Sequence, residues 1–540
     1  MIWRLGAVVL ALALLQAGEQ RVPVEGVIHD AQTGAPISSA QVRLSGTLPG
    51  ETRPTTLSAT SAQDGKFRFM ALPAEYTLTA QRDGYFAQTV FGVWQAAFQQ
   101  KIKVISGQPP PPSTLNLSAT GVITGHVLDQ TGKPANRVQV AAMQLRYAEG
   151  RPTFTAVNSV TTNERGEYRL FWVPPGDYVV AFNPGPAAAL SPQILTIGNT
   201  PSIQTLTFFP GTTDRSKART VSLASGEEVQ NVDFAIQTVP VATVSGRVDY
   251  PFVPSPPSPT GAITGLPNFS LFSQESLTTN LLSLANSNNL PMTLRQQGLF
   301  EFRSIAVGTY DLLVTVPAIN GQTGQSGQLH FNVGTQGLKD ITIAMKPLVE
   351  LQGKVVAEGI KLPENAIARL LPALTIFPSE TPIGANGDFR FTNLSAGTYR
   401  LDVTLPDGAF IADLRSNVFQ LPTRNNEHVT LSIRGNAGRI TGTVSKTDGK
   451  IGNDTTVVLV PEKALWENSM LFATSRLDES GKFSLTHVAP GTYKLFAWEG
   501  VLNTAWLNAD FLSRNEEGGM PISIDAGGVE DVRIMATPLR

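Results

Sequence analysis

Apolar and polar residues alternate with a period of two in five short stretches that repeat one another along the chain. The last of them reads SGKFSLTHVAPGTYKL (480–495), and similar stretches begin at residues 64, 165, 297 and 386. Each contains a glycine, two alternating apolar residues, a short segment rich in Pro, Ala or Gly, and a second alternation that starts at a tyrosine. Alternation of this kind is typical of half-buried strands joined by a turn. The pattern therefore predicts five β-hairpins of common design.

A second pattern precedes every hairpin: an apolar residue, any residue, a glycine, any residue and another apolar residue. Its central glycines are Gly26, Gly125, Gly246, Gly353 and Gly442. On a strand, alternation places the two apolar residues and the glycine on the same face. A glycine on the inward face of a strand usually marks the close approach of another backbone or side chain. We therefore expect each of these glycines to lie against a neighbouring strand or ring.

The tyrosine that opens the second hairpin strand is predicted to be structural. It follows a turn and begins an inward-facing alternation, as in a tyrosine corner, where the ring packs inward and the hydroxyl binds backbone a few residues upstream. The distance from the hairpin glycine to this tyrosine is 12 residues in four units. It is 11 in the first unit, where the segment LPAEY has lost the turn glycine. Because the turn fixes the register of a hairpin, the spacing persists while the residues vary.

The spacing of the repeats predicts separate domains. Successive hairpin glycines lie 89 to 132 residues apart, which is the size of a β-sandwich and well above the roughly 20 to 50 residues of a solenoid repeat. A chain of 540 residues also exceeds what one hydrophobic core usually holds. We predict an all-β protein, a tandem array of about five immunoglobulin-like β-sandwiches.

The predicted segments follow from these repeats and from local composition. They are a signal peptide (1–17), sandwich 1 (18–106), a Pro-rich linker (107–114), sandwich 2 (115–238), sandwich 3 (239–346) with an insertion (251–289), sandwich 4 (347–435) and sandwich 5 (436–540). Helix is expected only in short pieces, best around LWENSM (465–470) and TAWLNADFLSRNEE (504–517), with a further short helix expected in the insertion around Leu277 to Ala285.

The first residues have the pattern of a secretory signal peptide. Arg4 and the amino terminus supply positive charge, residues 5–15 form a short apolar run, and LQA ending at Ala17 offers small residues for cleavage. The run is short for a membrane span, so export is the main interpretation and a retained anchor is the alternative. No later stretch is apolar enough to cross a membrane. The chain has no cysteine, which excludes disulfides and thiolate metal sites.

With both patterns in place, each unit resembles the carboxypeptidase regulatory-like domain, a prealbumin-like β-sandwich related to carbohydrate-binding-like folds. The residues that carry the resemblance are DAQTGAPISSAQVRL in unit 1, VLDQTGKP in unit 2 and the hairpins that end in PGTY or AGTY. Stretches in the later parts of the units are similar to those of long bacterial exported proteins built from such domains. The resemblance implies a non-catalytic accessory domain, and it implies little about activity because a fold alone does not define a function.

The sequence offers no constellation of catalytic or metal-binding residues. None of the five histidines stands in an HExxH or HxxE pattern, and Walker, dinucleotide and nucleophile-elbow motifs are missing. His487, whose counterparts are interpreted as Ala71, Trp172, Ser304 and Asn393, is expected to be a polar residue at a strand end. The turn TDGKIGND (447–454) holds oxygen ligands that suit calcium, but turn chemistry explains the same residues and is preferred. No cofactor, metal or catalytic residue is predicted.

The aromatic residues give one pointed hypothesis. Alternation from Tyr493 places Phe496 and Trp498 on the outward face of their strand, and no other unit has two aromatics there. An exposed tryptophan can stack on a sugar ring through its flat, amphipathic face. The alternative is that the following segment, with Trp506, folds back and buries both rings as a satellite cluster. Phe496, Trp498, Trp506 and Trp94 are therefore the candidate ligand-stacking residues.

Two functions from different classes remain open. The main hypothesis is a non-enzymatic exported array that binds carbohydrate or a cell-surface polymer, or acts as an envelope spacer or adhesive module, with weak sites adding by avidity. The alternative is an interaction or assembly accessory of the cell envelope that binds another protein through an exposed strand edge. A net charge of −2 without a long basic tract argues against nucleic acid. We expect the mature chain in the periplasm, at the cell surface or secreted, not spanning the membrane.

Overall fold

The computed structural model describes residues 21–88, 94–184, 193–250, 267–273, 292–294, 298–318, 323–373, 378–412, 417–422, 428–446, 455–478 and 480–539. These residues form ten β-sheets, which pack in pairs as five sandwiches, each around its own buried core. The predicted all-β tandem array is confirmed. The predicted signal peptide, most of the insertion and the turn at 447–454 lie outside the described residues.

Sandwich 1 packs a sheet of order β4-β1-β9-β6-β7 on a sheet of order β3-β2-β5-β8. Its strands are β1 (Val22–Asp30), β2 (Gln41–Thr47), β3 (Pro54–Thr60), β4 (Lys66–Ala71), β5 (Ala74–Gln81), β6 (Tyr85–Gln88), β7 (Trp94–Gln95), β8 (Phe98–Val104) and β9 (Ser113–Ala119). β9 follows the Pro-rich segment and pairs in parallel with β1, with Leu115 opposite Ile28. Residues 105–112 therefore connect β8 and β9 within sandwich 1, and sandwich 1 continues past the boundary predicted at residue 115.

Sandwich 2 packs the sheet β13-β10-β19, to which β20 adds, on the sheet β12-β11-β14-β17, to which β18 adds. Its elements are β10 (Gly121–Leu128), β11 (Gln139–Ala148), β12 (Arg151–Thr161), β13 (Glu167–Val173), β14 (Gly176–Phe182), β17 (Thr207–Phe208), the 3-10 helix η1 (Arg215–Lys217), β18 (Thr220–Leu223), β19 (Glu228–Val229) and β20 (Phe234–Ala235). The hairpin of β11 and β12 is the longest of this sandwich, with 10 and 11 residues.

Sandwich 3 packs the sheet β15-β16-β21-β24-β23, to which β27 adds, on the sheet β22-β25-β26-β28. Its strands are β15 (Leu195–Ile197), β16 (Thr200–Gln204), β21 (Thr238–Asp249), β22 (Asn268–Ser273), β23 (Met292–Leu294), β24 (Leu299–Ala306), β25 (Gly308–Val316), β26 (Gln325–Val333), β27 (Leu338–Ala344) and β28 (Lys346–Pro347). β15 and β16 come from the predicted range of sandwich 2 but extend a sheet of sandwich 3, because β16 pairs with β21.

Sandwiches 4 and 5 complete the array. Sandwich 4 packs β32-β29-β36-β34 on β31-β30-β33-β35, and sandwich 5 packs β40-β37-β43 on β39-β38-β41-β42. The elements of sandwich 4 are β29 (Val349–Glu358), β30 (Ile367–Pro372), β31 (Ser379–Pro382), β32 (Asp388–Leu394), β33 (Gly397–Val403), β34 (Phe410–Ala412), β35 (Val418–Leu421) and β36 (Val429–Arg434). Those of sandwich 5 are β37 (Gly438–Ser445), β38 (Thr456–Pro461), η4 (Lys463–Leu465), η5 (Ser469–Leu471), β39 (Ala473–Arg476), β40 (Lys482–Val488), β41 (Gly491–Trp498), η6 (Ala505–Leu507), α4 (Ala509–Asn515), β42 (Met520–Ile524) and β43 (Val529–Met535).

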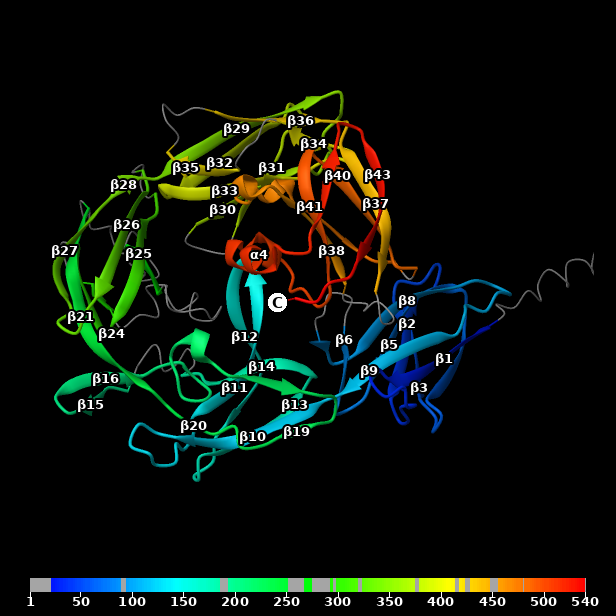
Figure 1. The fold of residues 1–540 in the computed structure, drawn as a ribbon, viewed down its shortest axis with the longest axis horizontal. Helices are drawn as coiled ribbons and strands as arrows, with labels where there is room; N and C mark the ends of the chain where they lie inside the picture. The colour runs from blue at the N-terminus through cyan, green and yellow to red at the C-terminus, as the bar shows by residue number, and fades with distance from the viewer. Residues whose placement is uncertain are drawn as a thin grey trace, which may run out of the picture.

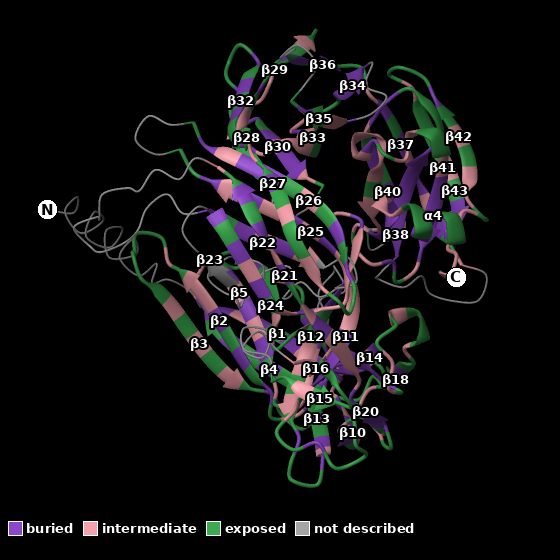
Figure 2. Ribbon diagram, turned by 90° about the vertical axis from the view of Figure 1, so that its left-hand side faces the viewer, coloured by how far each residue is buried: buried purple, intermediate pink, exposed green. Residues whose placement is uncertain are grey.

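All five hairpin tyrosines form the predicted corner. Each hydroxyl donates to the carbonyl oxygen four residues upstream at 2.6–3.0 Å: Tyr76 to Leu72, Tyr178 to Pro174, Tyr310 to Ala306, Tyr399 to Ser395 and Tyr493 to Ala489. Burial raises the pKa of Tyr399 and of Tyr493 to about 12. The recurring tyrosine is therefore a core residue whose hydroxyl has a hydrogen-bond partner. Buried and exposed positions alternate along the strands, as the purple and green bands in Figure 2 show.

The close approach predicted at the strand glycines is confirmed. A Cβ atom added to Gly353 would meet the ring of Phe389, and one added to Gly442 would meet the backbone of Val532 and the ring of Phe483. The same crowding surrounds the equivalent glycines of the other three sandwiches: Gly26, Gly125 and Gly246. Glycine is required there because the adjacent strands leave no room for a side chain.

The first hairpin strand carries a β-bulge in sandwiches 2 to 5, and the bulge residue has a φ of 55–62°: Trp172, Ser304, Asn393 and His487. In sandwich 1 the equivalent strand β4 pairs with β1 without a shift, and Ala71 lies opposite Val22 as Val173 lies opposite Gly121. The 11-residue spacing of the first unit therefore reflects a missing bulge residue. The turn glycine of the other units is replaced by Ala74, so its absence does not shorten the spacing, and Ala71 is not a counterpart of His487.

Sandwiches 2 to 5 lie around a common centre, with sandwich 1 on the outer side of sandwich 2 (Figure 1). Neighbouring sandwiches share direct contacts. Gln328 donates to the carbonyl of Ala396 between sandwiches 3 and 4 at 2.7 Å, and Ser225 N donates to Gln32 between sandwiches 2 and 1 at 3.2 Å. β12 and α4 both lie toward the centre of the ring, where sandwiches distant in sequence meet.

Candidate functional site

The residues predicted to stack on sugar do not form an exposed surface. Phe496 and Trp498 are each 2% exposed and Trp506 is 8% exposed. η6 and α4 cover their face of β41, and the ring of Phe511 meets Trp498 edge-on with 5.5 Å between centroids. The satellite cluster considered as the alternative is therefore confirmed, and the stacking surface predicted for these three residues is wrong. The side chain of Trp94, in β7, lies outside the described residues.

Local sequence explains why this segment folds back. The side chain of Asn508 accepts the backbone N–H of Phe511 at 2.8 Å and caps the first turn of α4, whose inner face buries Phe511 and Leu512. These apolar residues cover the strand β41, where Phe496 stacks on Trp498 with 4.4 Å between ring centroids. The short helices predicted at 465–470 and 504–517 correspond to η4 and η5 and to η6 and α4.

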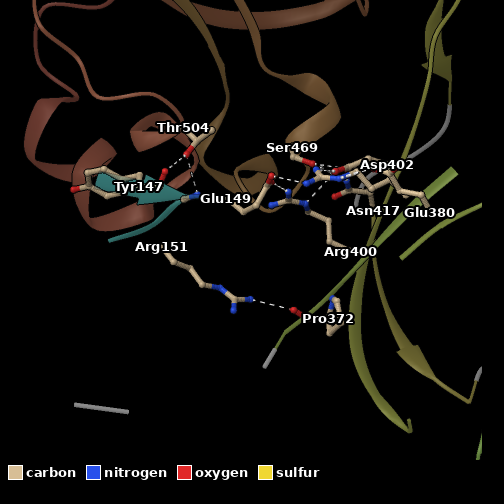
Figure 3. Close-up of polar contacts among 12 residues, drawn as sticks. Tyr147, Glu149, Arg151, Pro372, Glu380, Arg400, Asp402, Asn417, Ser469 and Thr504 are labelled. Carbon is tan, nitrogen blue, oxygen red and sulfur yellow. Dashed lines mark hydrogen bonds and ion pairs between the residues drawn. The ribbon is translucent and has the colours of Figure 1, made fainter. Parts of the chain in front are cut away.

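The hairpin of β11 and β12 joins three sandwiches at the centre of the ring. Its two-residue turn is Glu149–Gly150, and both residues have left-handed φ values, 52° and 79°, as in a type I′ turn. Figure 3 shows how the tip of this hairpin lies between residues of sandwich 4 and of sandwich 5. We call this three-way contact the hub, defined by residues 147–151 and the groups that they bind in the two other sandwiches.

On one side of the hub, Glu149 binds two arginines of sandwich 4. Its carboxylate lies 2.8 Å from Nη2 of Arg369 and also accepts a hydrogen bond from Nη2 of Arg400. The three side chains are 15–29% exposed, so water screens the contact only partly. Burial opposes ionisation of Glu149, but the hydrogen bonds and charges of the arginines outweigh it and hold the pKa of Glu149 below its ordinary value.

The arginines are themselves anchored within sandwich 4 and toward sandwich 5. Asp402 faces Nε of Arg400 at 3.4 Å and accepts hydrogen bonds from Asn417 and Ser469, both at 2.8 Å. Ser469 belongs to η5 of sandwich 5, and Asn417 is fully buried. The hub therefore continues as a polar network between sandwiches 4 and 5, which also meet where His487 Nδ1 contacts the carbonyl of Ala409 at 3.1 Å.

On the other side of the hub, the hairpin tip binds sandwich 5 through its backbone. Thr504 Oγ1 donates to the carbonyl of Tyr147 at 3.1 Å, and Asn508 Nδ2 donates to the carbonyl of Gly150 at 3.0 Å. A Cβ atom on Gly150 would lie 2.7–2.9 Å from atoms of Leu507. The ring of Tyr147 meets Phe511 edge-on at 6.1 Å between centroids, which links the hairpin to the buried aromatic cluster.

The hub residues were not predicted from the sequence. Glu149–Gly150 between two alternating segments is a recognisable hairpin turn, but the arginines that bind it lie 220 and 251 residues further along the chain. No local pattern indicates which sandwich a surface hairpin will meet. One feature of the sequence could have indicated the arginines. Arg369 and Arg400 stand in the middle of strands of sandwich 4 whose other side chains are mostly apolar or small.

The structure exposes a different aromatic pair, Phe171 and Trp172, at the bulge of β13. Among the described residues, no group of three or more His, Asp or Glu side chains is placed to hold a metal ion. No helix in the described part of the chain is both long and apolar enough to span a membrane. The arrangement of the described residues supplies contact surfaces and fixed geometry between sandwiches.

Residues 23–117 match the family model of the carboxypeptidase regulatory-like domain. The resemblance predicted from the sequence is thereby confirmed for sandwich 1, and the match ends within β9, in agreement with the pairing of β9 with β1. Domains of this kind are non-catalytic. No curated protein matches the sequence.

Comparison with solved structures finds pilins and the TIE protein at low similarity. The TIE protein of Bacillus anthracis is 14% identical, with 76% of this chain and 73% of that chain covered and a TM-score of 0.15. The minor pilin GBS52 of Streptococcus agalactiae is 16% identical, with 44% and 100% covered and a TM-score of 0.21. The major pilin subunit BcpA of Bacillus cereus is 9% identical, with 77% and 99% covered and a TM-score of 0.16. At these TM-scores the likenesses carry no argument about function.

Proposed function

We propose that this protein is a non-catalytic, exported binding protein that presents its sandwiches as one closed body to a carbohydrate or another cell-surface polymer. The observation that carries the proposal is the hub, where Glu149 of sandwich 2 binds Arg369 and Arg400 of sandwich 4 while Gly150 binds Asn508 of sandwich 5. A closed ring of sandwiches spans a shorter distance than the same sandwiches would span in a row, which makes it poorly suited to be a spacer. It is suited to holding several surfaces at fixed distances.

Fixed distances matter because a polymer offers many equivalent binding points. When the sites on the protein are already held in position, forming the second contact does not require the domains to be ordered against each other. The entropy loss of that ordering is therefore not subtracted from the binding free energy. Several weak contacts can then add to useful affinity without a deep pocket. A flexible string of the same sandwiches would lose part of this gain to conformational entropy.

The proposal is tested by affinity electrophoresis of residues 18–540 through gels that contain single polysaccharides. We expect at least one polysaccharide to retard the wild-type chain, and we expect Glu149→Gln to weaken that retardation several-fold because the hub opens. Glu380→Gln is the matched control, since Glu380 faces Arg369 from within sandwich 4 at 3.7 Å and does not bridge two sandwiches.

Three outcomes would contradict parts of the proposal. If no polysaccharide retards the wild-type chain, polymer binding is wrong and a protein partner recovered from the envelope becomes the alternative to pursue. If Glu149→Gln binds as well as the wild type, the closed body is not what supports binding. If Glu380→Gln weakens retardation equally, the effect comes from the charge of sandwich 4 and not from closure.

A further inference from the structure

Two aromatic side chains of sandwich 2 are exposed together on its outer sheet. Phe171 is 45% exposed and Trp172 is 53% exposed, and their rings meet edge-on with 5.4 Å between centroids. Both belong to the bulge near the end of β13, where Trp172 has a φ of 55°. β13, β10 and β19 lie on the outer side of the ring, away from β12 and α4 (Figure 1).

The scaffold does not require aromatic residues at this bulge. The equivalent bulge residues are Ser304, Asn393 and His487 in the other sandwiches that have one. A bulky side chain in a left-handed conformation is strained, and a half-exposed indole recovers little of that cost through burial. Folding therefore gives no reason for Trp172, whereas a ligand that covers the ring would supply one.

Planar polar groups lie on the same face of the outer sheet. Arg169, on β13, forms a two-point contact with Glu228 at 3.0 and 3.2 Å. His126, on the neighbouring β10, faces Asp233 at 3.2 Å and Glu167 at 3.9 Å. These five side chains are 38–56% exposed, so they remain accessible to a ligand. The face carries three carboxylates and one guanidinium, which gives it a negative balance.

We propose that the indole face of Trp172, held edge-on against the ring of Phe171, stacks on a pyranose ring of a neutral polysaccharide whose hydroxyls are bound by the planar polar groups of the same face. The proposal rests on the proposed function and names its site and ligand class. A pyranose ring has apolar C–H faces that suit aromatic rings and hydroxyls at its rim that suit carboxylates and guanidinium. The surplus of carboxylates repels an anionic polymer, which is why the neutral class is favoured.

The chain itself offers the substitution that tests the site. In sandwich 4 the two bulge positions hold Thr392 and Asn393, and Asn393 has a φ of 58°. The double variant Phe171→Thr and Trp172→Asn therefore replaces the aromatic pair by residues that this bulge already accommodates. Ser304→Asn is the matched control, because it changes the same bulge position in sandwich 3.

The experiment is affinity electrophoresis of residues 18–540 through gels of hydroxyethylcellulose, xylan, galactomannan and the anionic polymer alginate. We expect at least one neutral polymer to retain the wild type, a tenfold or greater loss of affinity in the double variant, and no change in Ser304→Asn. Alginate should retain none of them. Tryptophan emission gives a second readout: the retaining polymer should shift it to shorter wavelength in the wild type and not in the double variant.

Each contrary outcome points to a different error. Equal retention of the wild type and the double variant would overturn this site while the proposed function stands. Failure of every polymer to retain the wild type would overturn both. Stronger retention by alginate would overturn the neutral ligand class. Full recovery after adding Thr392→Phe and Asn393→Trp to the double variant would show that an aromatic pair binds equally well from another sandwich, and would overturn the assignment of the site to the outer sheet of sandwich 2.

Discussion

Gly353 shows how one missing methyl group decides the packing of a sandwich. A Cβ atom at this position would overlap the ring of Phe389 on the adjacent strand, and Phe389 is part of the core of sandwich 4. Gly353→Ala is therefore expected to displace that ring and destabilise the sandwich by about 1–3 kcal/mol, the usual cost of overpacking. The measurement is hydrogen exchange of the amides in β29 and β32.

Gly334 provides the control for this prediction. It follows β26 in sandwich 3, and no atom lies within 4 Å of the position that its Cβ would take. Gly334→Ala should leave hydrogen exchange of its neighbours unchanged or slightly slower, because alanine restricts the unfolded chain more than glycine does. Equal protection of β29 in wild type and Gly353→Ala would show that Phe389 yields without cost, contrary to the expected overlap.

At the scale of elements, the segment that contains η6 and α4 decides whether Trp498 meets water. Phe511 of α4 packs edge-on against Trp498 and also against Tyr147 of β11. Phe511→Ala is expected to cost about 3–5 kcal/mol of local stability, as large-to-small changes in a core do. Tryptophan emission should move to longer wavelength and the amides of α4 should exchange faster.

Ser513→Ala, at an exposed position of the same helix, is the control and should change neither the emission nor the exchange. An unshifted emission in Phe511→Ala would mean that other side chains fill the space left by the ring.

The same segment shows where inference from sequence succeeds and where it ends. Alternation correctly predicts that Phe496 faces away from the core shared by the two sheets, because a strand has only two faces. It does not say what covers that second face, which depends on a loop and helix folding back. The tyrosine corners and strand glycines were predictable because each depends on neighbours within one hairpin or sheet. Glu149 was not, because its partners lie on another sandwich.

The bulge positions show a feature that the structure reveals and the sequence does not. Trp172, Ser304, Asn393 and His487 look like a freely varying position in the sequence, and they share one backbone conformation in the structure. The shared conformation aims each side chain outward, so its identity follows from what lies there. His487 contacts the backbone of sandwich 4, whereas Trp172 is open to solvent. A variable residue on a fixed geometry is therefore a better guide to function than the repeated residues are.

For the whole molecule, closure at the hub should depend on pH through Glu149. Burial alone would raise the pKa of this carboxyl, but Arg369 and Arg400 lower it below its ordinary value of 4.5 in the closed state. A carboxyl with a lowered pKa in one state stabilises that state above its ordinary pKa and loses the effect as pH falls through the lowered value. Closure is therefore fully supported at neutral pH and weakens below about pH 4.5.

Small-angle X-ray scattering of residues 18–540 measures this directly, because opening the hub frees sandwich 2 from sandwiches 4 and 5 and increases the radius of gyration. We expect the wild type to expand reversibly as pH falls below about 4.5, while far-UV circular dichroism still reports folded sandwiches. Glu149→Gln should already be expanded at pH 7, since two arginines are then left without their shared carboxylate, a loss of about 1.5–3 kcal/mol for hydrogen bonds to a charged group. Glu380→Gln should follow the wild type. A radius that is the same for Glu149→Gln and wild type at pH 7 would mean that the backbone contacts of Gly150 with sandwich 5 hold the ring closed on their own.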